Sequence, residues 1–298
     1  MTAGFTDRWA RWILKDRFGG EEAAKRKAIE SLEPIRDRVL LGGHIAPGDV
    51  VLDVGCGDGL IGFGALPLVG GTGHVVFTDI SDELLEACRR IALQLAVSER
   101  CHFARTEAET LKVIGDSSVD VVTTRSVLIY VEEKAAAFAA FHRVLKPGGR
   151  VSLFEPINRR YAEMNRGALF GFDTAPISDV AAKVLAVYEA AAPSGGAMMG
   201  FDEADLLRLA ESTGFSDITV TLELSSNPTS PSVGVSWTQL MKTSPNPNAP
   251  TFGPAIRQAL TSDQAEQLET YLRPLVGGGT GGRSRGAVAY LTAIKAKF

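Results

Sequence analysis

Short β-rich segments alternate with helical patterns between Asp49 and Pro156, and this alternation limits the possible folds more than any other feature of the sequence. The β-rich segments read VVLDV, HVVFTD, CHFART, VDVVTT and RVSLFE, and the helical patterns between them include residues 82–97 and 133–145. Strands that alternate with helices form a parallel sheet. The segments are apolar at successive positions, as is typical of strands covered on both faces. We therefore predict an α/β, doubly wound, Rossmann-like sheet with helices on both faces.

A helical segment precedes this alternation. Phe5, Trp9, Trp12 and Ile13 recur at helical spacing, and a second helical pattern follows over residues 21–41. We expect that second helix to be interrupted at Pro34, which can restart a helix as its first residue. The sequence thus predicts an N-terminal helical cap over residues 1–44. Its aromatic stripe either covers a ligand or packs into the core.

Two further segments interrupt the alternation later in the chain. Residues 157–200 contain a candidate helix, and residues 225–285 contain a loop rich in Ser, Pro and Asn followed by a helix that begins with the capping-box pair Thr261 and Gln264. We interpret both segments as lid insertions, which would carry the specificity for a ligand.

The composition excludes several classes of protein. The chain of 298 residues has 31 Lys and Arg against 35 Asp and Glu, a net charge of −4, so no broad positive field favours nucleic acid. Three cysteines without a C-x-x-C pair argue against disulfides and zinc fingers and indicate a reducing cytoplasm. No apolar run approaches the roughly 18 residues of a membrane helix, so no membrane association is expected. The four histidines are isolated from one another, and no metal site is predicted.

The segment VVLDVGCGDGLIGFGAL places three glycines at alternate positions where a strand ends and a helix begins. Gly55, Gly57 and Gly59 let the backbone turn sharply and approach a ligand, and the helix N-terminus can receive an anionic group. Asp79 ends the next β-rich segment, 20 residues after Gly59. A carboxylate there can accept hydrogen bonds from both hydroxyls of a ribose, whereas the alternative is that Asp79 only caps the helix that follows.

The same glycines permit a second interpretation. Gly57, Gly59 and Gly62 also match G-x-G-x-x-G, the dinucleotide fingerprint of NAD-dependent oxidoreductases. A dinucleotide-binding strand should run directly into the first glycine of its motif. Here the strand ends at Val54 and Gly55 already lies in the turn, which disfavours that alternative.

Taken together, these motifs resemble those of the class I S-adenosylmethionine-dependent methyltransferases. The resemblance covers about residues 49–156 and consists of D-x-G-x-G-x-G at residues 53–59, Asp79, TEAETL, VDVVTTRSVLIYV and RVLKPGGRVSLFEP. It implies a seven-stranded, mostly parallel sheet in which DITVTLEL and AVAYLTAI form the last hairpin, with the final strand antiparallel. It also implies a methyltransferase domain over residues 45–298 and the cofactor S-adenosyl-L-methionine, with S-adenosyl-L-homocysteine as product.

The resemblance assigns a cofactor site by position. The glycine loop would hold the methionyl part of the cofactor, Asp79 the ribose, Ile80 a face of the adenine, residues 107–109 the adenine edge, and residues 125–126 the region near the methyl group. Thr106-Glu107 stands where many relatives have Gly-Asp. The cofactor-binding residues expected in this way are Asp53, Gly55, Cys56, Gly57, Gly59, Asp79, Ile80, Glu107, Ala108, Glu109, Arg125 and Ser126.

The acceptor site is predicted from the carboxyl edge of the sheet, where open α/β sheets bind ligands. Tyr130, after the fourth strand, is the candidate catalytic residue and acceptor contact, with a packing aromatic as the alternative. His142 lies late in a helix, remote from that edge. The remaining acceptor-binding candidates are Glu155, Asn158, Arg159 and Tyr161 after the fifth strand, and Met198 and Met199 as adaptable apolar side chains.

The function predicted from these motifs is methyl transfer to a small or medium organic acceptor. Positioning of the acceptor can supply most of the acceleration, and a general base is needed only where the acceptor must lose a proton. The alternatives are methylation of a peptide or protein, an NAD-dependent oxidoreductase and a non-catalytic binding protein. An arsenic-methylating subtype would need three converging thiolates, which Cys56, Cys88 and Cys101 are not expected to form.

Overall fold

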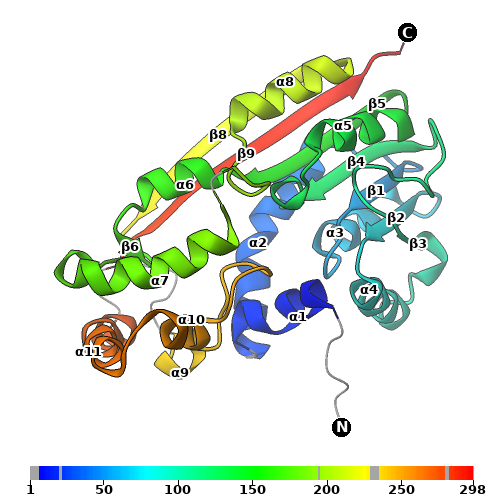
Figure 1. Cartoon of the computed structure of the whole chain (residues 1–298). Coiled ribbons are helices and arrows are strands. Elements are labelled where there is room, and N and C mark those ends of the chain that lie inside the picture. Colours follow the sequence, from blue (N-terminus) through cyan, green and yellow to red (C-terminus); the bar gives the residue numbers. More distant parts are fainter. Residues whose placement is uncertain (1–6, 20–21, 194, 229–234, 279–281, 298) are drawn as a thin grey trace.

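A seven-stranded sheet in the order β3-β2-β1-β4-β5-β9-β8 forms the centre of the molecule (Figure 1). The computed structural model describes residues 7–19, 22–193, 195–228, 235–278 and 282–297. The strands β1 to β5 are parallel, and β9 lies antiparallel between β5 and β8. Their bounds are β1 Val50–Val54, β2 His74–Asp79, β3 Cys101–Arg105, β4 Val119–Arg125, β5 Leu145–Pro156, β8 Phe215–Asn227 and β9 Ser284–Lys295. The predicted doubly wound sheet with an antiparallel final strand is confirmed.

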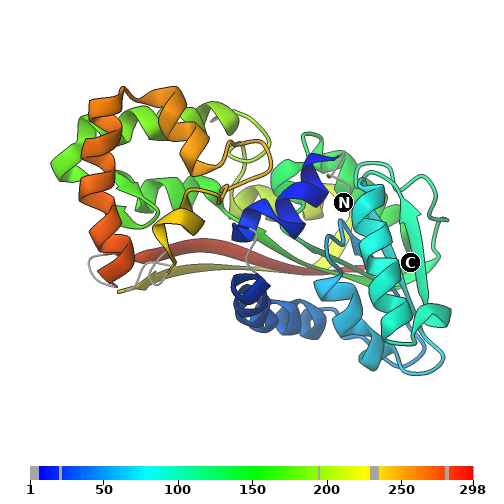
Figure 2. The same cartoon turned by 90° about the horizontal axis from the view of Figure 1, so that it is seen from below.

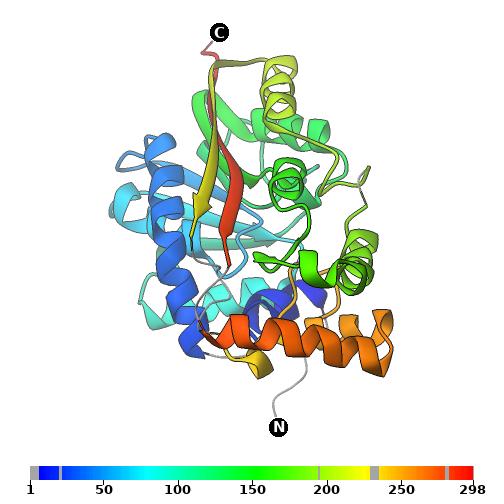
Figure 3. The ribbon, with the colours of Figure 1, turned by 90° about the vertical axis from the view of Figure 1, so that its left-hand side faces the viewer.

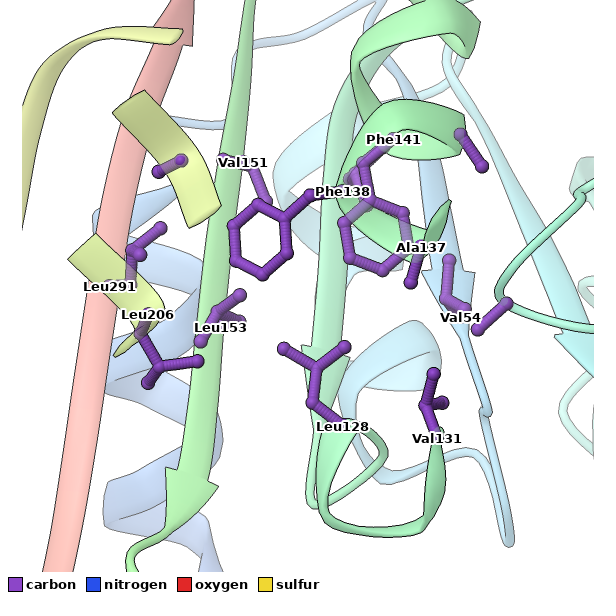
Figure 4. Packing of buried hydrophobic residues seen from close by; sticks show 14 of the residues in the cluster. Val54, Leu128, Val131, Ala137, Phe138, Phe141, Val151, Leu153, Leu206 and Leu291 are labelled. Atoms are coloured by element: carbon purple, nitrogen blue, oxygen red, sulfur yellow. The ribbon is translucent and has the colours of Figure 1, made fainter. Parts of the chain in front are cut away.

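Helices cover both faces of this sheet, as the apolar strands require. On one face α2 (Glu22–Gly42), α3 (Leu60–Val69) and α4 (Asp82–Gln94) form a core with β1, β2 and β4. On the other, α5 (Lys134–Val144) and α8 (Glu203–Thr213) pack against β4, β5 and β9. Figure 3 shows α2 and α8 on opposite sides of the β8–β9 pair. In Figure 4, Phe138 of α5 lies among Val151 and Leu153 of β5 and Leu206 of α8.

The strand order places a ligand crevice beside β1. This strand pairs with β2 on one side and β4 on the other, and the chain moves outward from it in both directions. The carboxyl ends of β1, β2 and β4 therefore surround a topological switch point, where sheets of this kind bind their ligands.

The N-terminal segment contains α1 (Arg8–Leu14), the short helix η1 (Asp16–Phe18) and α2. The interruption expected at Pro34 does not occur, because α2 continues through this residue. Pro34 is exposed, so the carbonyl that loses its hydrogen-bond partner can be hydrated. The fifth strand is longer than the expected segment RVSLFE. Residues 145–149 also belong to β5, which has a register irregularity against β4 between Val119 and Val121.

The two predicted insertions pack against each other beside the sheet (Figure 2). The first comprises α6 (Asn158–Met164), β6 (Ala168–Leu169), β7 (Phe172–Asp173), η4 (Ala175–Ile177) and α7 (Ser178–Ala191), and the second contributes α9 (Trp237–Leu240), α10 (Phe252–Ala259) and α11 (Ser262–Gly278). Val180 and Val184 of α7 share a buried cluster with Phe252 of α10 and Leu268 and Leu272 of α11. The expected pair Thr261 and Gln264 is present at the start of α11.

Two short helices complete the chain, η2 (Ser98–Arg100) before β3 and η3 (Leu128–Tyr130) after β4. Within the described ranges, no helix combines the length and the apolar character needed to span a bilayer.

Candidate active site

A cavity of about 840 Å³ opens at the carboxyl ends of β1, β2 and β4. Its walls come from the loop after β1, the ends of β2 and β4, the segment after β3, helix α1 and the two insertions. The residues that line it include Asp7, Trp9, Trp12, Ile13, Arg17, Asp53, Gly55, Cys56, Gly57, Asp58, Asp79, Ile80, Ser81, Glu107, Ala108, Glu109, Arg125, Ser126, Ile129, Tyr130, Asn158, Met198 and Ser244.

The loop after β1 depends on glycine at two of its positions. Gly55 has φ +64°, and a Cβ atom there would lie 2.4 Å from Cγ2 of Val127. Gly59 has φ +85°, precedes α3, and would place a Cβ 2.4 Å from the ring of Phe63. Both positions are closed to other residues, and at Gly55 the bare backbone forms part of the cavity wall.

Asp53 supports this loop from below. Its Oδ2 accepts a hydrogen bond from the Gly62 amide at 2.9 Å, and its Oδ1 accepts one from Thr123 Oγ1 at 3.4 Å. Burial raises the pKa of Asp53 to about 7, against the lowering effect of the Gly62 amide. A Cβ on Gly62 would lie 2.2 Å from the Phe77 ring. Gly62 thus allows α3 to pack closely on Phe77 of β2 and donates its amide to Asp53.

Asp79 at the end of β2 faces the same loop. Its Oδ2 accepts from the Gly57 amide and its Oδ1 from the Ser81 amide, both at 3.0 Å. Burial raises the pKa of Asp79, while these amides oppose the shift. The cap of α4 is Ser81, whose Oγ accepts from the Leu84 amide at 3.1 Å. The alternative in which Asp79 only caps α4 is therefore wrong.

The residues predicted to contact the adenine all line the cavity. Ile80 is exposed and lines the wall, and residues 107–109 line it from the segment after β3. The Thr106 amide donates to the Asp79 carbonyl at 3.1 Å, and the Arg105 guanidinium donates to the Ile80 carbonyl at 3.0 Å. These bonds fix the spacing between the two strand ends.

Helix α1 forms part of the cavity wall, so its aromatic stripe faces the cavity. Trp9, Trp12 and Ile13 line the cavity, whereas Phe5 lies outside the described residues. Trp12 Nε1 donates to the Ser244 carbonyl at 3.0 Å, and the Ser244 amide donates to the Asp16 carbonyl at 3.2 Å. The helix thus connects the cavity to the second insertion.

Asp7 and Arg17 are cavity residues that sequence reasoning missed. Asp7 is the N-cap of α1 and accepts from the amides of Trp9 (2.8 Å) and Ala10 (2.9 Å). Its other oxygen accepts a hydrogen bond from Ser81 Oγ, which attaches α1 to the end of β2. The N-cap position of Asp7 before the aromatic stripe is a signal in the sequence, but its contact with Ser81 is not.

Tyr130 lies in η3 and lines the cavity, as its position after β4 indicated. Burial raises the pKa of its hydroxyl, so that the neutral phenol persists through the physiological range. Ser126, just before η3, has φ +56°, a left-handed conformation that is uncommon for a residue with a side chain. Its amide donates to the Phe154 carbonyl at 2.9 Å, which holds the turn in place.

The structure differs from the expectation for Glu155. Its side chain is fully buried and accepts from the amides of Val127 (3.0 Å), Leu128 (2.9 Å) and Ile129 (3.2 Å). Glu155 lies within β5, so it faces the η3 turn and does not line the cavity. Burial raises its pKa to about 7, and the three amides oppose this shift.

Of the other expected acceptor contacts, Asn158 and Met198 line the cavity and three residues do not. Arg159 is exposed and forms an ion pair with Asp202 at 3.2 Å, because it starts the outward face of α6. Tyr161 is 45% exposed on the same helix, and Met199 lies outside the cavity wall. The periodicity of a short helix was not visible in the sequence at this point.

The three cysteines are buried thiols. Cys56 lines the cavity, and Cys88 Sγ of α4 contacts the Gly57 carbonyl at 3.4 Å behind the loop. No group of three or more His, Cys, Asp or Glu side chains in the described part of the chain could hold a metal ion.

Comparison with known proteins also indicates a methyltransferase domain. Residues 45–170 match the model of a methyltransferase domain. The chain is 38% identical over 111 residues to the ubiquinone/menaquinone biosynthesis C-methyltransferase UbiE of Ectopseudomonas mendocina, which covers 37% of this chain and 43% of the relative. It is 36% identical over 113 residues to an arsenite methyltransferase of Halobacterium salinarum, covering 38% of this chain and 28% of the relative. The chain thus spans less than half the length of these two relatives.

Two solved structures share the fold over most of the chain. The YcgJ protein from Bacillus subtilis superimposes with a TM-score of 0.54 at 15% identity, and a protein described as a putative methyltransferase from Bacillus halodurans with 0.53 at 17%. Each alignment covers 88% of this chain and 98% of the other. Residues 45–170 thus contain a methyltransferase domain, and the motifs and the fold around it are similar to those of the class I S-adenosylmethionine-dependent methyltransferases.

Proposed function

We propose that the protein transfers the methyl group of S-adenosyl-L-methionine to a small or medium organic acceptor. The observation that carries this proposal is a single cavity in which the glycine loop, Asp79 and Tyr130 meet beneath α1. The cofactor would supply an electrophilic methyl group on a sulfonium. Because transfer of that group needs no redox or metal chemistry, the protein has to bind the cofactor and the acceptor, orient them and exclude water.

The residues present fit such a cofactor. The carboxylate of Asp79 is nearly buried and accepts hydrogen bonds from the amides of Gly57 and Ser81, and its remaining lone pairs would accept from the ribose hydroxyls. The glycine loop offers bare backbone for the methionyl part, and Ile80 offers an apolar face to the adenine. We assign residues 107–109 to the adenine edge and Arg125 and Ser126 to the end near the methyl group.

Tyr130 is our candidate for the residue that orients the acceptor. Its hydroxyl stays protonated, so it would act as a hydrogen-bond donor and not as a general base at physiological pH. Asn158 and Met198 would complete the acceptor end, with Arg159, Tyr161, Met199 and Glu155 left outside it.

The walls of the cavity support a small acceptor over a peptide. Helix α1 forms one of these walls and is joined to the second insertion through the hydrogen bond from Trp12 to Ser244. We further propose one catalytic domain over residues 45–298 with insertions at 157–200 and 225–285, and a cytoplasmic location, which the three unpaired cysteines support.

The test supplies methyl-labelled cofactor together with either a pool of small metabolites or a peptide library. We expect label in the small-molecule fraction with the wild-type protein and, at a cofactor concentration that does not saturate the variant, at least tenfold less with Asp79→Ala. Asp179→Ala is the matched control, because Asp179 is an exposed carboxylate in the first turn of α7. Label in peptides alone would replace the small acceptor with a macromolecular one, and no transfer to either would contradict the proposed activity.

A further inference from the structure

Two arginines bring positive charge to one region of the cavity. Arg125 ends β4, and Arg17 lies in η1 directly after the α1 lid, with its guanidinium 5.2 Å from the centre of the Trp12 ring. Both line the cavity together with Tyr130. Burial and, to a lesser extent, the charge of Arg125 lower the pKa of Arg17 to about 10, while Asp58, which also lines the cavity, opposes this shift. Asp58 therefore offsets part of the positive charge at Arg17, and Arg125 carries the second positive charge of this region.

Among the described residues, none of the cavity carboxylates forms an ion pair with Arg125, although its charge opposes the rise in the pKa of the buried Asp53. Asp79 and Asp7 accept backbone amides and Ser81 through both of their oxygens. Asp53 is buried against Gly62 and Thr123. Among the residues that the structure describes, the Arg125 guanidinium forms no ion pair or hydrogen bond, although it is half-buried. A guanidinium is a rigid, always charged fork suited to a carboxylate or phosphate.

The proposed cofactor does not balance these charges either. Its methionyl end carries an ammonium beside its carboxylate, and its sulfonium adds one more positive charge. The bound cofactor would thus add one net positive charge to the cavity, whose wall also carries carboxylates such as Asp58 and Asp79. An anionic group on the acceptor would complement the guanidinium of Arg125, which none of these carboxylates pairs.

The rest of this region is apolar. Trp9, Trp12, Ile129, Val131 and Met198 line the wall around Tyr130. Such a surface buries an apolar body, while a few convergent polar groups fix its orientation. The two features together describe an amphiphilic ligand.

We propose that Arg17 and Arg125 bind an oxyanion, a carboxylate or phosphate group, on an acceptor whose apolar body lies against Trp9, Ile129 and Met198. The inference rests on the proposed function, since it names the class of acceptor for the same cavity. It assigns to Arg125 a role in acceptor binding and adds Arg17, which lies outside the sequence motifs.

The test titrates the protein, saturated with S-adenosyl-L-homocysteine, with phenylacetate, phenyl phosphate and the neutral phenylacetamide in a calorimeter. At least one acid should bind tenfold or more tightly than phenylacetamide. Arg125→Gln and Arg17→Gln should each lower the affinity for that acid at least tenfold, and Arg125→Lys should lower the affinity less. Arg208→Gln is the matched control, because it removes an exposed guanidinium on α8 that is paired with Asp205. Melting temperatures would confirm that each variant is folded.

The outcomes separate the inference from the function on which it rests. Equal binding of the acids and the amide, no binding of either acid, or acid binding unchanged in Arg125→Gln would overturn the inference while the cofactor site stands. A tenfold loss of S-adenosyl-L-homocysteine affinity in Arg125→Gln, with 5′-methylthioadenosine affinity unchanged, would assign the guanidinium to the cofactor carboxylate and also overturn it. Failure of the wild-type protein to bind S-adenosyl-L-homocysteine would instead contradict the proposed function.

Discussion

The indole ring of Trp9 meets the phenol ring of Tyr130 nearly edge-on, with their centroids 4.7 Å apart. Trp9 belongs to α1, which forms part of the cavity wall, and Tyr130 belongs to the turn after β4. The contact therefore joins α1 to the candidate catalytic residue. A displacement of α1 would change the surroundings of Tyr130 and the shape of the cavity.

Trp9→Ala should weaken binding of S-adenosyl-L-homocysteine by up to about tenfold. An edge-to-face aromatic pair contributes about 0.5–1.5 kcal/mol beyond its buried area, and its loss would leave α1 less firmly closed. Calorimetric titration measures the change. Trp237→Ala serves as the control, because Trp237 packs on Phe252 in the insertions and does not line the cavity. An unchanged affinity in Trp9→Ala would show that α1 does not cover the cofactor.

Asp79→Ala should reduce affinity for S-adenosyl-L-homocysteine by about 1.5–3 kcal/mol, the range for hydrogen bonds to a charged group. The variant also frees the amides of Gly57 and Ser81, so part of the loss will come from the loop. Separate titrations with adenosine and with homocysteine distinguish the loss of the ribose hydrogen bonds from the change in the glycine loop. A loss confined to homocysteine would be inconsistent with the ribose assignment, and Asp179→Ala should bind like the wild type.

Tyr130→Phe should lower kcat and leave the KM for the cofactor near its wild-type value. The substitution keeps the ring and its contact with Trp9 but removes the hydroxyl that would orient the acceptor. Because burial raises the pKa of this hydroxyl, the wild-type rate should show no ionisation of Tyr130 below pH 10. Steady-state kinetics with the acceptor identified by labelling would measure kcat, the KM for the cofactor and the pH dependence of the rate. Equal kinetics in the variant would reduce Tyr130 to a packing residue.

The stability of the protein should fall as pH rises from about 5 to 7. Burial raises the pKa of Glu155 from 4.5 to about 7, so the folded state keeps a proton that the unfolded chain releases within this window. A raised carboxyl pKa contributes stability that is present below the unfolded pKa and lost as pH passes the folded one. One such group changes the free energy of unfolding by up to about 1.4 kcal/mol per pH unit.

Glu155→Gln tests the origin of this slope. It removes the titrating group, so the slope measured by urea unfolding at pH 5, 6 and 7 should become shallower. Some slope should remain, because burial also raises the pKa of Asp53 to about 7. The exposed Asp179→Asn should leave the slope as it is. Identical slopes in Glu155→Gln and the wild type would show that Glu155 does not titrate in this range.

Local patterns in the sequence were sufficient to predict the sheet and the residues expected to bind the cofactor. The alternation over residues 49–156 predicted the parallel strands, because that pattern depends on neighbours in the chain. The positions of Gly55, Gly59 and Asp79 follow from strand ends in the same way. All of the residues expected to bind the cofactor except Gly59 line the cavity, and Gly59 lies where α3 begins.

The remaining differences arise from contacts between distant segments. Glu155 was expected at the acceptor because it lies at the carboxyl edge, yet its orientation is set by the amides of the η3 turn, 26–28 residues earlier. Arg159 pairs with Asp202 across 43 residues, and Asp7 reaches Ser81 across 74. No pattern within one segment encodes these pairings.

Calorimetric titration of the wild-type protein with S-adenosyl-L-homocysteine, beside NAD and NADP under the same conditions, tests the central claim most directly. The proposed function predicts micromolar binding of S-adenosyl-L-homocysteine and none of either nicotinamide nucleotide. Binding of NAD or NADP without S-adenosyl-L-homocysteine would contradict it.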